Sequence, residues 1–135
     1  EGKKLAILNF GARLNATLKA AENLLKKGVP ITVVDARFAK PLDENLIWQL
    51  ATTHEAIMTI EEGSIGGFGS HVVNFLTKKG LMDSNLKFRS LTLPDIFIDQ
   101  DTPDKMYKVA NLDSVSIEEK VLDLLNSNIV LKKQN

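Results

Sequence analysis

Apolar residues in this chain follow two different spacings. Short aliphatic and β-branched runs, of the length expected for buried strands, lie at 4–9, 31–35, 56–60 and 88–93. Between these runs, apolar residues recur three and four positions apart, as on one face of a helix, first at Leu14, Leu18, Ala21 and Leu25. The pattern predicts strands that alternate with helices along the chain.

Turn and capping residues set the bounds of the first three predicted helices. Gly28 follows the first helix, as glycine often does at a helix end. Asp43 predicts an N-cap for the second helix, whose apolar positions are Leu46, Ile47, Leu50 and Ala51. Gly80 ends a third helix, which is marked by Val72, Val73 and Leu76.

Two further helices are predicted in the last third of the chain. Thr102 followed by Pro103 predicts a capped helix that runs to about Ala110. The stretch Ser116-Ile117-Glu118-Glu119 resembles a capping box, and it predicts that the last helix opens at Ser116. The residues of this helix expected to face the core are Ile117, Val121 and Leu124.

Strands that alternate with helices predict an α/β fold. We expect a three-layer αβα arrangement with a mostly parallel sheet, because each crossover lays a helix over the sheet. Residues 1–135 are predicted to form a single domain, with 126–135 as a frayed tail. The sequence opens at Glu1 without an initiator Met, which is compatible with a fragment of a longer chain.

Composition narrows the possible functions. The 17 basic and 17 acidic residues cancel, which argues against binding nucleic acid or a membrane by bulk charge. No apolar run approaches the roughly 20 residues of a membrane span, and the absence of cysteine suits a cytoplasmic protein. With only His54 and His71, a histidine-rich metal site is not expected, and His54 is interpreted as a helix cap.

A glycine-rich loop follows the third predicted strand. Residues 63–70 read G-S-I-G-G-F-G-S, and backbone amides around Gly66, Gly67 and Gly69, with Ser70 and His71, could contact an anion. The loop matches neither the dinucleotide pattern GxGxxG nor the phosphate loop GxxxxGK[ST]. We favour the alternative that the glycines supply positive φ angles and close packing between a helix and the sheet.

Charged residues also stand at the ends of predicted strands. Glu61 and Glu62 are adjacent, so their side chains point to opposite faces and do not readily form an acid/base pair. We expect one of them to cap the next helix and the other to contact a partner. Asp35 and Arg37, with Lys40, could hold a phosphate, although a local ion pair before the next helix is favoured.

Several stretches resemble a known family. The runs 5-LAILNFG-11, 35-DARFAKPLDE-44, 54-HEAIMTIEEGSIGGFGSHV-72 and 93-LPDIFIDQD-101 are similar to the C-terminal domain of 1-deoxy-D-xylulose-5-phosphate synthases, within the transketolase superfamily. The similarity covers about residues 3 to 125. The D-x-R-x-x-x-P-x-D pattern also occurs in β subunits of 2-oxo-acid dehydrogenases, whereas LPD-x-FI is more specific to the synthases. Asp101 departs from the glycine that many synthases have there.

The resemblance implies an enzyme that uses thiamine diphosphate and Mg²⁺ to join pyruvate and glyceraldehyde 3-phosphate with loss of CO₂, for isoprenoid, thiamine and pyridoxal synthesis. In that family a GDG motif in the first domain holds the diphosphate and the metal, and a glutamate in the second domain activates the pyrimidine ring of the cofactor. This sequence contains no GDG motif. The resemblance therefore implies a noncatalytic domain that binds no cofactor itself, packs on the N-terminal and middle domains, and stabilises a homodimer.

Two alternatives to this interpretation stay open. The chain could be a stand-alone α/β module that binds a small phosphorylated or anionic ligand at the loop Gly63–Gly69. It could also be a docking domain of a 2-oxo-acid dehydrogenase β subunit, although the LPD-x-FI run argues against this.

Overall fold

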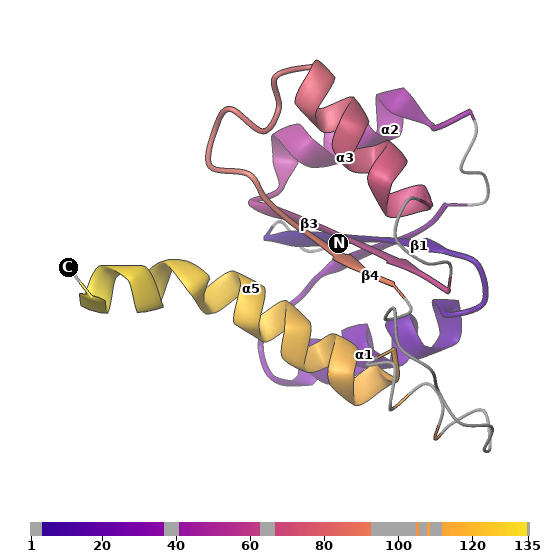
Figure 1. The fold of residues 1–135 in the computed structure, drawn as a ribbon. Coiled ribbons are helices and arrows are strands. Elements are labelled where there is room, and N and C mark those ends of the chain that lie inside the picture. Colours follow the sequence, from indigo (N-terminus) through magenta and orange to yellow (C-terminus); the bar gives the residue numbers. More distant parts are fainter. Residues whose placement is uncertain are drawn as a thin grey trace.

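The computed structural model describes residues 4–36, 41–62, 67–92, 105, 108 and 112–134, the last eight as backbone only. The elements follow the order β1 (Leu5–Phe10), α1 (Leu14–Lys26), β2 (Thr32–Asp35), α2 (Glu44–Thr53), β3 (Ala56–Glu61), α3 (Phe68–Lys78), β4 (Lys87–Leu91) and α5 (Ser114–Gln134) (Figure 1). Strands and helices alternate from β1 to β4, as the spacing predicted.

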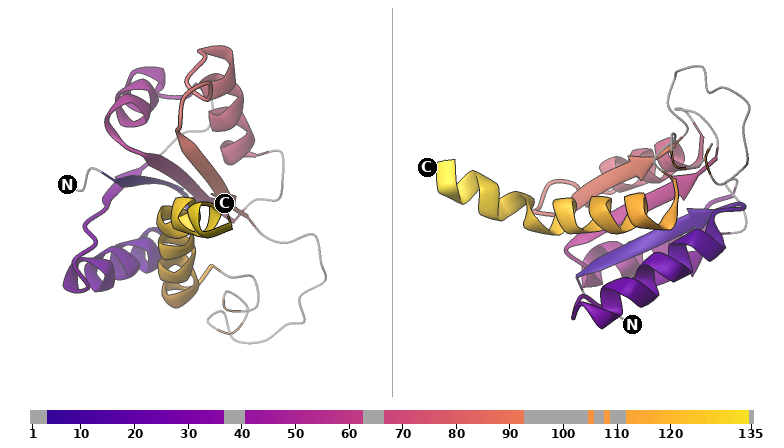
Figure 2. Two further views of the ribbon diagram at one scale, coloured as in Figure 1. Left: turned by 90° about the vertical axis from the view of Figure 1, so that its left-hand side faces the viewer. Right: turned by 90° about the horizontal axis from the view of Figure 1, so that it is seen from below.

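The four described strands form one parallel sheet in the order β2-β1-β3-β4. Helices α1 and α5 cover one face of the sheet, and α2 and α3 cover the other (Figures 1 and 2). The predicted three-layer α/β fold is therefore confirmed.

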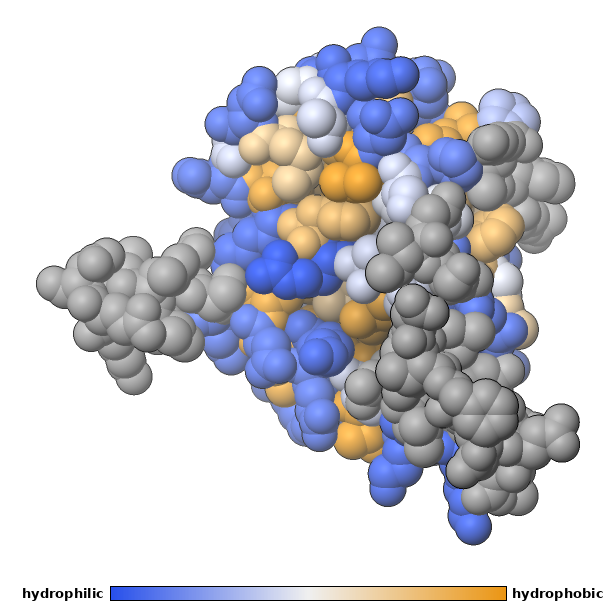
Figure 3. Space-filling view, viewed as in Figure 1, coloured by the Kyte–Doolittle hydropathy of each residue, from blue (hydrophilic) through white to orange (hydrophobic). Residues whose placement is uncertain are grey.

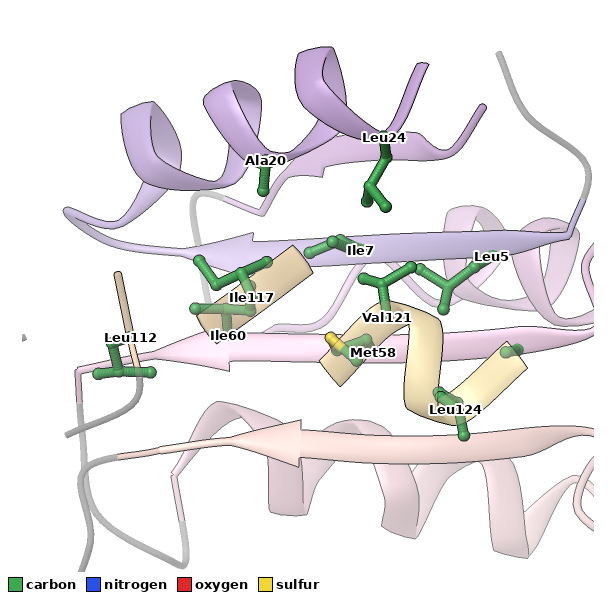
Figure 4. Packing of buried hydrophobic residues seen from close by; sticks show 11 residues of the cluster. Leu5, Ile7, Ala20, Leu24, Met58, Ile60, Leu112, Ile117, Val121 and Leu124 are labelled. Carbon is green, nitrogen blue, oxygen red and sulfur yellow. The ribbon is translucent and has the colours of Figure 1, made fainter. Parts of the chain in front are cut away.

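Both faces of the sheet are apolar, because the strands contain nearly continuous apolar runs and successive side chains of a strand point to opposite faces. On β1, Leu5 and Ile7 pack toward α1 and α5, and Ala6 and Leu8 pack toward α2 and α3. Figure 4 shows the first of these two clusters, in which strand residues meet side chains from α1 and α5. The residues of α5 that were predicted to face inward are all buried there: Ile117, Val121 and Leu124.

The apolar stripe predicted for α1 is wrong in part. Leu18 and Leu25 are 48% and 61% exposed, while the buried side chains of this helix are Thr17, Ala20 and Leu24. Thr17 is polar but can occupy an inward position, because its hydroxyl donates to the Asn9 side chain at 3.0 Å. Counting only apolar residues therefore misplaced part of the buried face: Leu14 and Ala21 are half-buried, and the other two predicted residues are exposed.

The predicted start of the last helix is also wrong. Helix α5 begins at Ser114, and the carboxylate of Asp113 accepts from the Ser116 backbone N–H at 3.3 Å. Asp113 thus acts as the N-cap, and Ser116 lies in the first turn. Aspartate caps a helix as well as serine does, so the capping-box spacing was misleading here.

Other predicted helix ends agree with the structure. Asp43 caps α2 by accepting from the Leu46 backbone N–H at 3.1 Å. Gly28 and Gly80 follow α1 and α3 with φ angles of 79° and 71°, a left-handed conformation that favours glycine. The helix predicted at Thr102-Pro103 begins outside the described residues.

Polar side chains cover most of the outer helices on the face shown in Figure 3, with apolar side chains between them. Within the described part of the chain, no helix is both long and apolar enough to cross a membrane.

Candidate functional site

The carboxyl ends of the strands meet at one edge, because all the described strands run parallel. Strand register places Asn9 opposite Asp35, and Phe10 opposite Glu61. Ligands of open parallel sheets generally lie beyond this edge. Most of the candidate site residues named above therefore follow strands that end here.

Glu61 is the most distinctive group at this edge. Its side chain is almost fully buried, at 3% exposure. The backbone N–H of Phe68 donates to Oε1 at 2.9 Å, and that of Gly69 donates to Oε2 at 2.5 Å. The prediction that a glutamate caps the next helix is confirmed for Glu61.

This contact changes how the glycine loop is interpreted. A carboxylate already lies where the amides and positive end of α3 would attract an external anion. A second anion at the same amides would be repelled by Glu61 and would have to displace it.

Gly69 brings α3 against the sheet. A Cβ atom at this position would lie 2.3 Å from Oγ of Ser90 and 2.8 Å from Oγ1 of Thr59. Those two hydroxyls are themselves joined by a hydrogen bond of 3.2 Å from Thr59 to Ser90. The prediction of close helix–sheet packing is confirmed at Gly69.

Positive φ angles do not explain the two loop glycines that the structure describes. Gly67 has φ of −86°, and Gly69 lies inside α3. The described glycines with positive φ are instead Gly11, Gly28 and Gly80. That part of the prediction was wrong for Gly67 and Gly69, where the backbone begins a helix that needs no left-handed residue.

The remaining candidates do not gather into one site. Ser70 lines a cavity of about 300 Å³ together with Glu61, whereas His71 lines a different cavity, of about 780 Å³, between α2 and α3. Asp35 is exposed and borders a third cavity, of about 260 Å³. Glu62 is half-buried. Three further candidates lie outside the described residues: Arg37, Lys40 and Gly66.

His54 is a helix cap, as predicted. It follows α2, and its Nδ1 lies 3.0 Å from the carbonyl oxygen of Leu50. Its Nε2 lies 2.9 Å from Oγ1 of Thr32, which begins β2. Nδ1 thus contacts the last turn of α2 and Nε2 contacts the sheet, so the ring joins the end of the helix to β2.

An ion pair between the two helices of one layer was missed by sequence reasoning. Nζ of Lys27 donates to Oε1 of Glu118 at 2.5 Å, and Asn23 donates to Oε2 at 3.4 Å. The hydrogen bond from Lys27 lowers the pKa of Glu118 and outweighs the opposing effect of burial. No local pattern signals this pair, because its members are 91 positions apart.

A family model shows where this architecture belongs. The model for the transketolase C-terminal domain matches residues 1–117. The chain therefore belongs to the transketolase C-terminal domain family.

A solved structure agrees with this assignment. It is described as "Split gene transketolase, inactive beta4 tetramer" and is similar to the chain with a TM-score of 0.82 and 28% sequence identity. The similarity covers 93% of this chain, and the chain spans 40% of the length of that protein.

Proposed function

We propose that this chain is the noncatalytic C-terminal domain of a 1-deoxy-D-xylulose-5-phosphate synthase. The observation that carries the noncatalytic role is the engagement of Glu61. Its carboxylate accepts from the backbone amides of Phe68 and Gly69, so the conspicuous acidic group at the strand edge serves the fold. A general acid or base needs instead to reach a reacting proton.

The synthase assignment within the transketolase family rests on sequence. The LPD-x-FI segment at 93–98 favours a synthase over other members of the family, and the stretch 54–72 is also similar to the synthases. Thiamine diphosphate and Mg²⁺ would then bind to other domains of the enzyme, where the GDG motif and the activating glutamate belong.

The proposed partners are the N-terminal and middle domains of the same enzyme, within a homodimer. The family match and the similarity to a protein described as a tetramer support association with further domains or copies. In this proposal Glu62, Ser70 and His71 contact a neighbouring domain, since they are at least partly accessible next to the strand edge.

The test compares the purified chain with the complete reading frame that encodes it. Each is incubated with pyruvate, glyceraldehyde 3-phosphate, thiamine diphosphate and Mg²⁺, and product formation is measured. We expect turnover from the complete protein and none from the chain. Turnover by the chain above a no-protein control would refute the noncatalytic role.

The same assay also tests the substrate assignment. A complete protein with transketolase activity, but none with pyruvate and glyceraldehyde 3-phosphate, would place the chain in another branch of the family. In that case the noncatalytic role would survive and the synthase assignment would not.

A further inference from the structure

One flank of α1 carries apolar side chains that the core does not bury. Leu18 and Leu25 are large apolar residues with exposed side chains, and Leu14 and Ala21 are only half-buried. These four positions are four, three and four residues apart, so their side chains form one line along the helix, which we call the α1 stripe. Single apolar residues are common on protein surfaces, whereas an aligned set favours a contact surface.

The α1 stripe lies on the side of the helix away from α5. Asn23 and Lys27 contact Glu118 of α5, and their positions lie on the opposite flank of α1 from the stripe. Figure 2 shows α1 beside α5 at the margin of their layer. Helix α1 packs against β2, an edge strand of the described sheet. There Val33 is half-buried, and its register partner Ile7 faces α1, so Val33 extends the apolar surface onto β2.

We propose that the α1 stripe binds a second copy of this chain, with the two α1 helices packed antiparallel. The spacing of the stripe is symmetric about a point midway between positions 19 and 20. A twofold axis at this point places Leu14 against Leu25 of the second copy. The same axis places Leu18 against Ala21, whose small side chain leaves room for a leucine. Each stripe residue thus meets an apolar partner.

Polar side chains next to the stripe favour the same orientation. In the antiparallel pair, the exposed Glu22 lies opposite position 17 of the second copy, between the exposed Asn15 and Lys19. Each of these donors is about 3 Å away along the helix axis, so both can reach the carboxylate. Glu22 also pairs with Lys26 of its own helix, at the surface, where a carboxylate can accept from further donors. A parallel pair would instead place each Glu22 beside Glu22 of the other copy.

The size of the stripe sets the expected strength of the contact. One stripe on a 13-residue helix offers less area than the roughly 800 Å² per partner of a stable complex. We therefore expect the chain by itself to dimerise weakly, with a Kd of about 0.1 mM. In the complete protein the contact would form part of the homodimer proposed above, and to that extent it rests on the proposed function. The experiment measures association and not turnover, so each proposal can fail without the other.

The experiment is sedimentation equilibrium of the 135-residue chain between about 10 µM and 1 mM. We expect a monomer–dimer equilibrium. The double variant Leu18→Gln/Leu25→Gln should raise the Kd by at least about tenfold, because apolar contacts are lost from both copies. The matched control, Trp48→Gln, removes an exposed apolar side chain from α2 on the other face of the sheet and should leave the Kd unchanged.

Charge reversal tests the antiparallel orientation. Glu22→Lys should raise the Kd by about fivefold, because the new positive charge would lie near Lys19 of the other copy. Lys19→Glu should weaken the dimer by a similar factor, since it would bring two carboxylates together. The double exchange Lys19→Glu/Glu22→Lys restores opposite charges across the contact and should return the Kd to within about twofold of wild type.

Three results would overturn the proposal. A chain that stays monomeric at about 1 mM would mean that the α1 stripe does not bind a second copy. Equal weakening by Trp48→Gln and by the double leucine variant would indicate nonspecific apolar association. A double charge exchange that leaves the dimer as weak as the single variants would exclude the antiparallel pair. Circular dichroism verifies that each variant is folded, and all the substituted side chains are exposed.

Discussion

Among single residues, Glu61 decides whether the amides at the start of α3 can bind an external anion. Helix N-termini attract anions, and here the preceding strand supplies the anion itself. The carboxylate is buried and accepts from amides on the next helix, so it ties β3 directly to α3. The amides of Phe68 and Gly69 at the start of α3 are therefore already bound to Glu61 and are not open to a phosphate.

Replacing Glu61 with Gln should destabilise the chain by about 1–3 kcal/mol, because charge-assisted hydrogen bonds to buried amides are weakened or lost. Urea unfolding at neutral pH measures the change. Glu55→Gln is the matched control, since Glu55 is an exposed carboxylate directly before β3, and it should change stability by less than about 0.5 kcal/mol. Equal losses for the two variants would contradict the assigned role of Glu61.

Gly69→Ala tests the close approach of α3 to the sheet. Alanine favours a helix by about 1 kcal/mol over glycine, but its Cβ would meet the hydroxyls of Ser90 and Thr59. We expect a net loss of about 1–3 kcal/mol from overpacking. In a Ser90→Ala background the loss should be smaller, because the nearest contact is removed. A stabilising effect of Gly69→Ala alone would show that the contact is easily relieved.

At the scale of elements, α1 has a buried side and an exposed side, each with leucine. Leu24 is fully buried and Leu25 is 61% exposed. We therefore expect Leu24→Ala to cost about 2–5 kcal/mol and Leu25→Ala less than about 0.5 kcal/mol. Thermal and urea unfolding of the two variants compare adjacent sites with the same substitution. Similar costs would mean that α1 is rotated from the orientation described above.

The ion pair between Lys27 and Glu118 should make the packing of α1 on α5 depend on pH. Its hydrogen bond lowers the pKa of Glu118 below the usual 4.5, so the stabilisation is present above that pH and is lost as the pH falls through the lowered value. At pH 7, Glu118→Gln should cost about 1 kcal/mol. The difference from wild type should shrink in acid, as measured by urea unfolding at pH 7 and pH 3.

Glu22→Gln is the control for this pH dependence. Glu22 pairs with Lys26 at 3.4 Å on the surface of α1, with both side chains about two-thirds exposed. Such a pair contributes only about 0.3–0.5 kcal/mol, so the pH profile of this variant should follow that of wild type. A Glu118→Gln deficit that stays constant into acid would argue against the ion pair.

The elements were predictable from spacing because strands and helices bury residues with different periods. The period alone misplaced the face of α1, where Thr17 is buried through its bond to Asn9. The capping-box pattern at Ser116 was also misleading, because Asp113 caps α5 instead. The candidate site was predicted as far as a cap by one of Glu61 and Glu62, and the structure shows that Glu61 is the one. The ion pair between Lys27 and Glu118 depends on segments far apart in the sequence, which no local pattern brings together.

At the scale of the whole molecule, the structure is a transketolase-family C-terminal domain with a parallel sheet between two helical layers. Glu61 and Gly69 join β3 to α3. The chain spans 40% of the length of a similar protein. These observations fit a domain whose contribution is packing. We infer that Glu61 supports the fold of such a domain and takes no part in the chemistry.

The most direct test is the kcat of Glu61→Gln in the complete enzyme, measured well below its melting temperature and normalised to folded protein. We predict a lower melting temperature and a kcat within about twofold of wild type, because the carboxylate is held by backbone amides. Loss of a general acid or base typically costs 10²- to 10⁴-fold. A fall of about 100-fold or more in folded enzyme would contradict the claim.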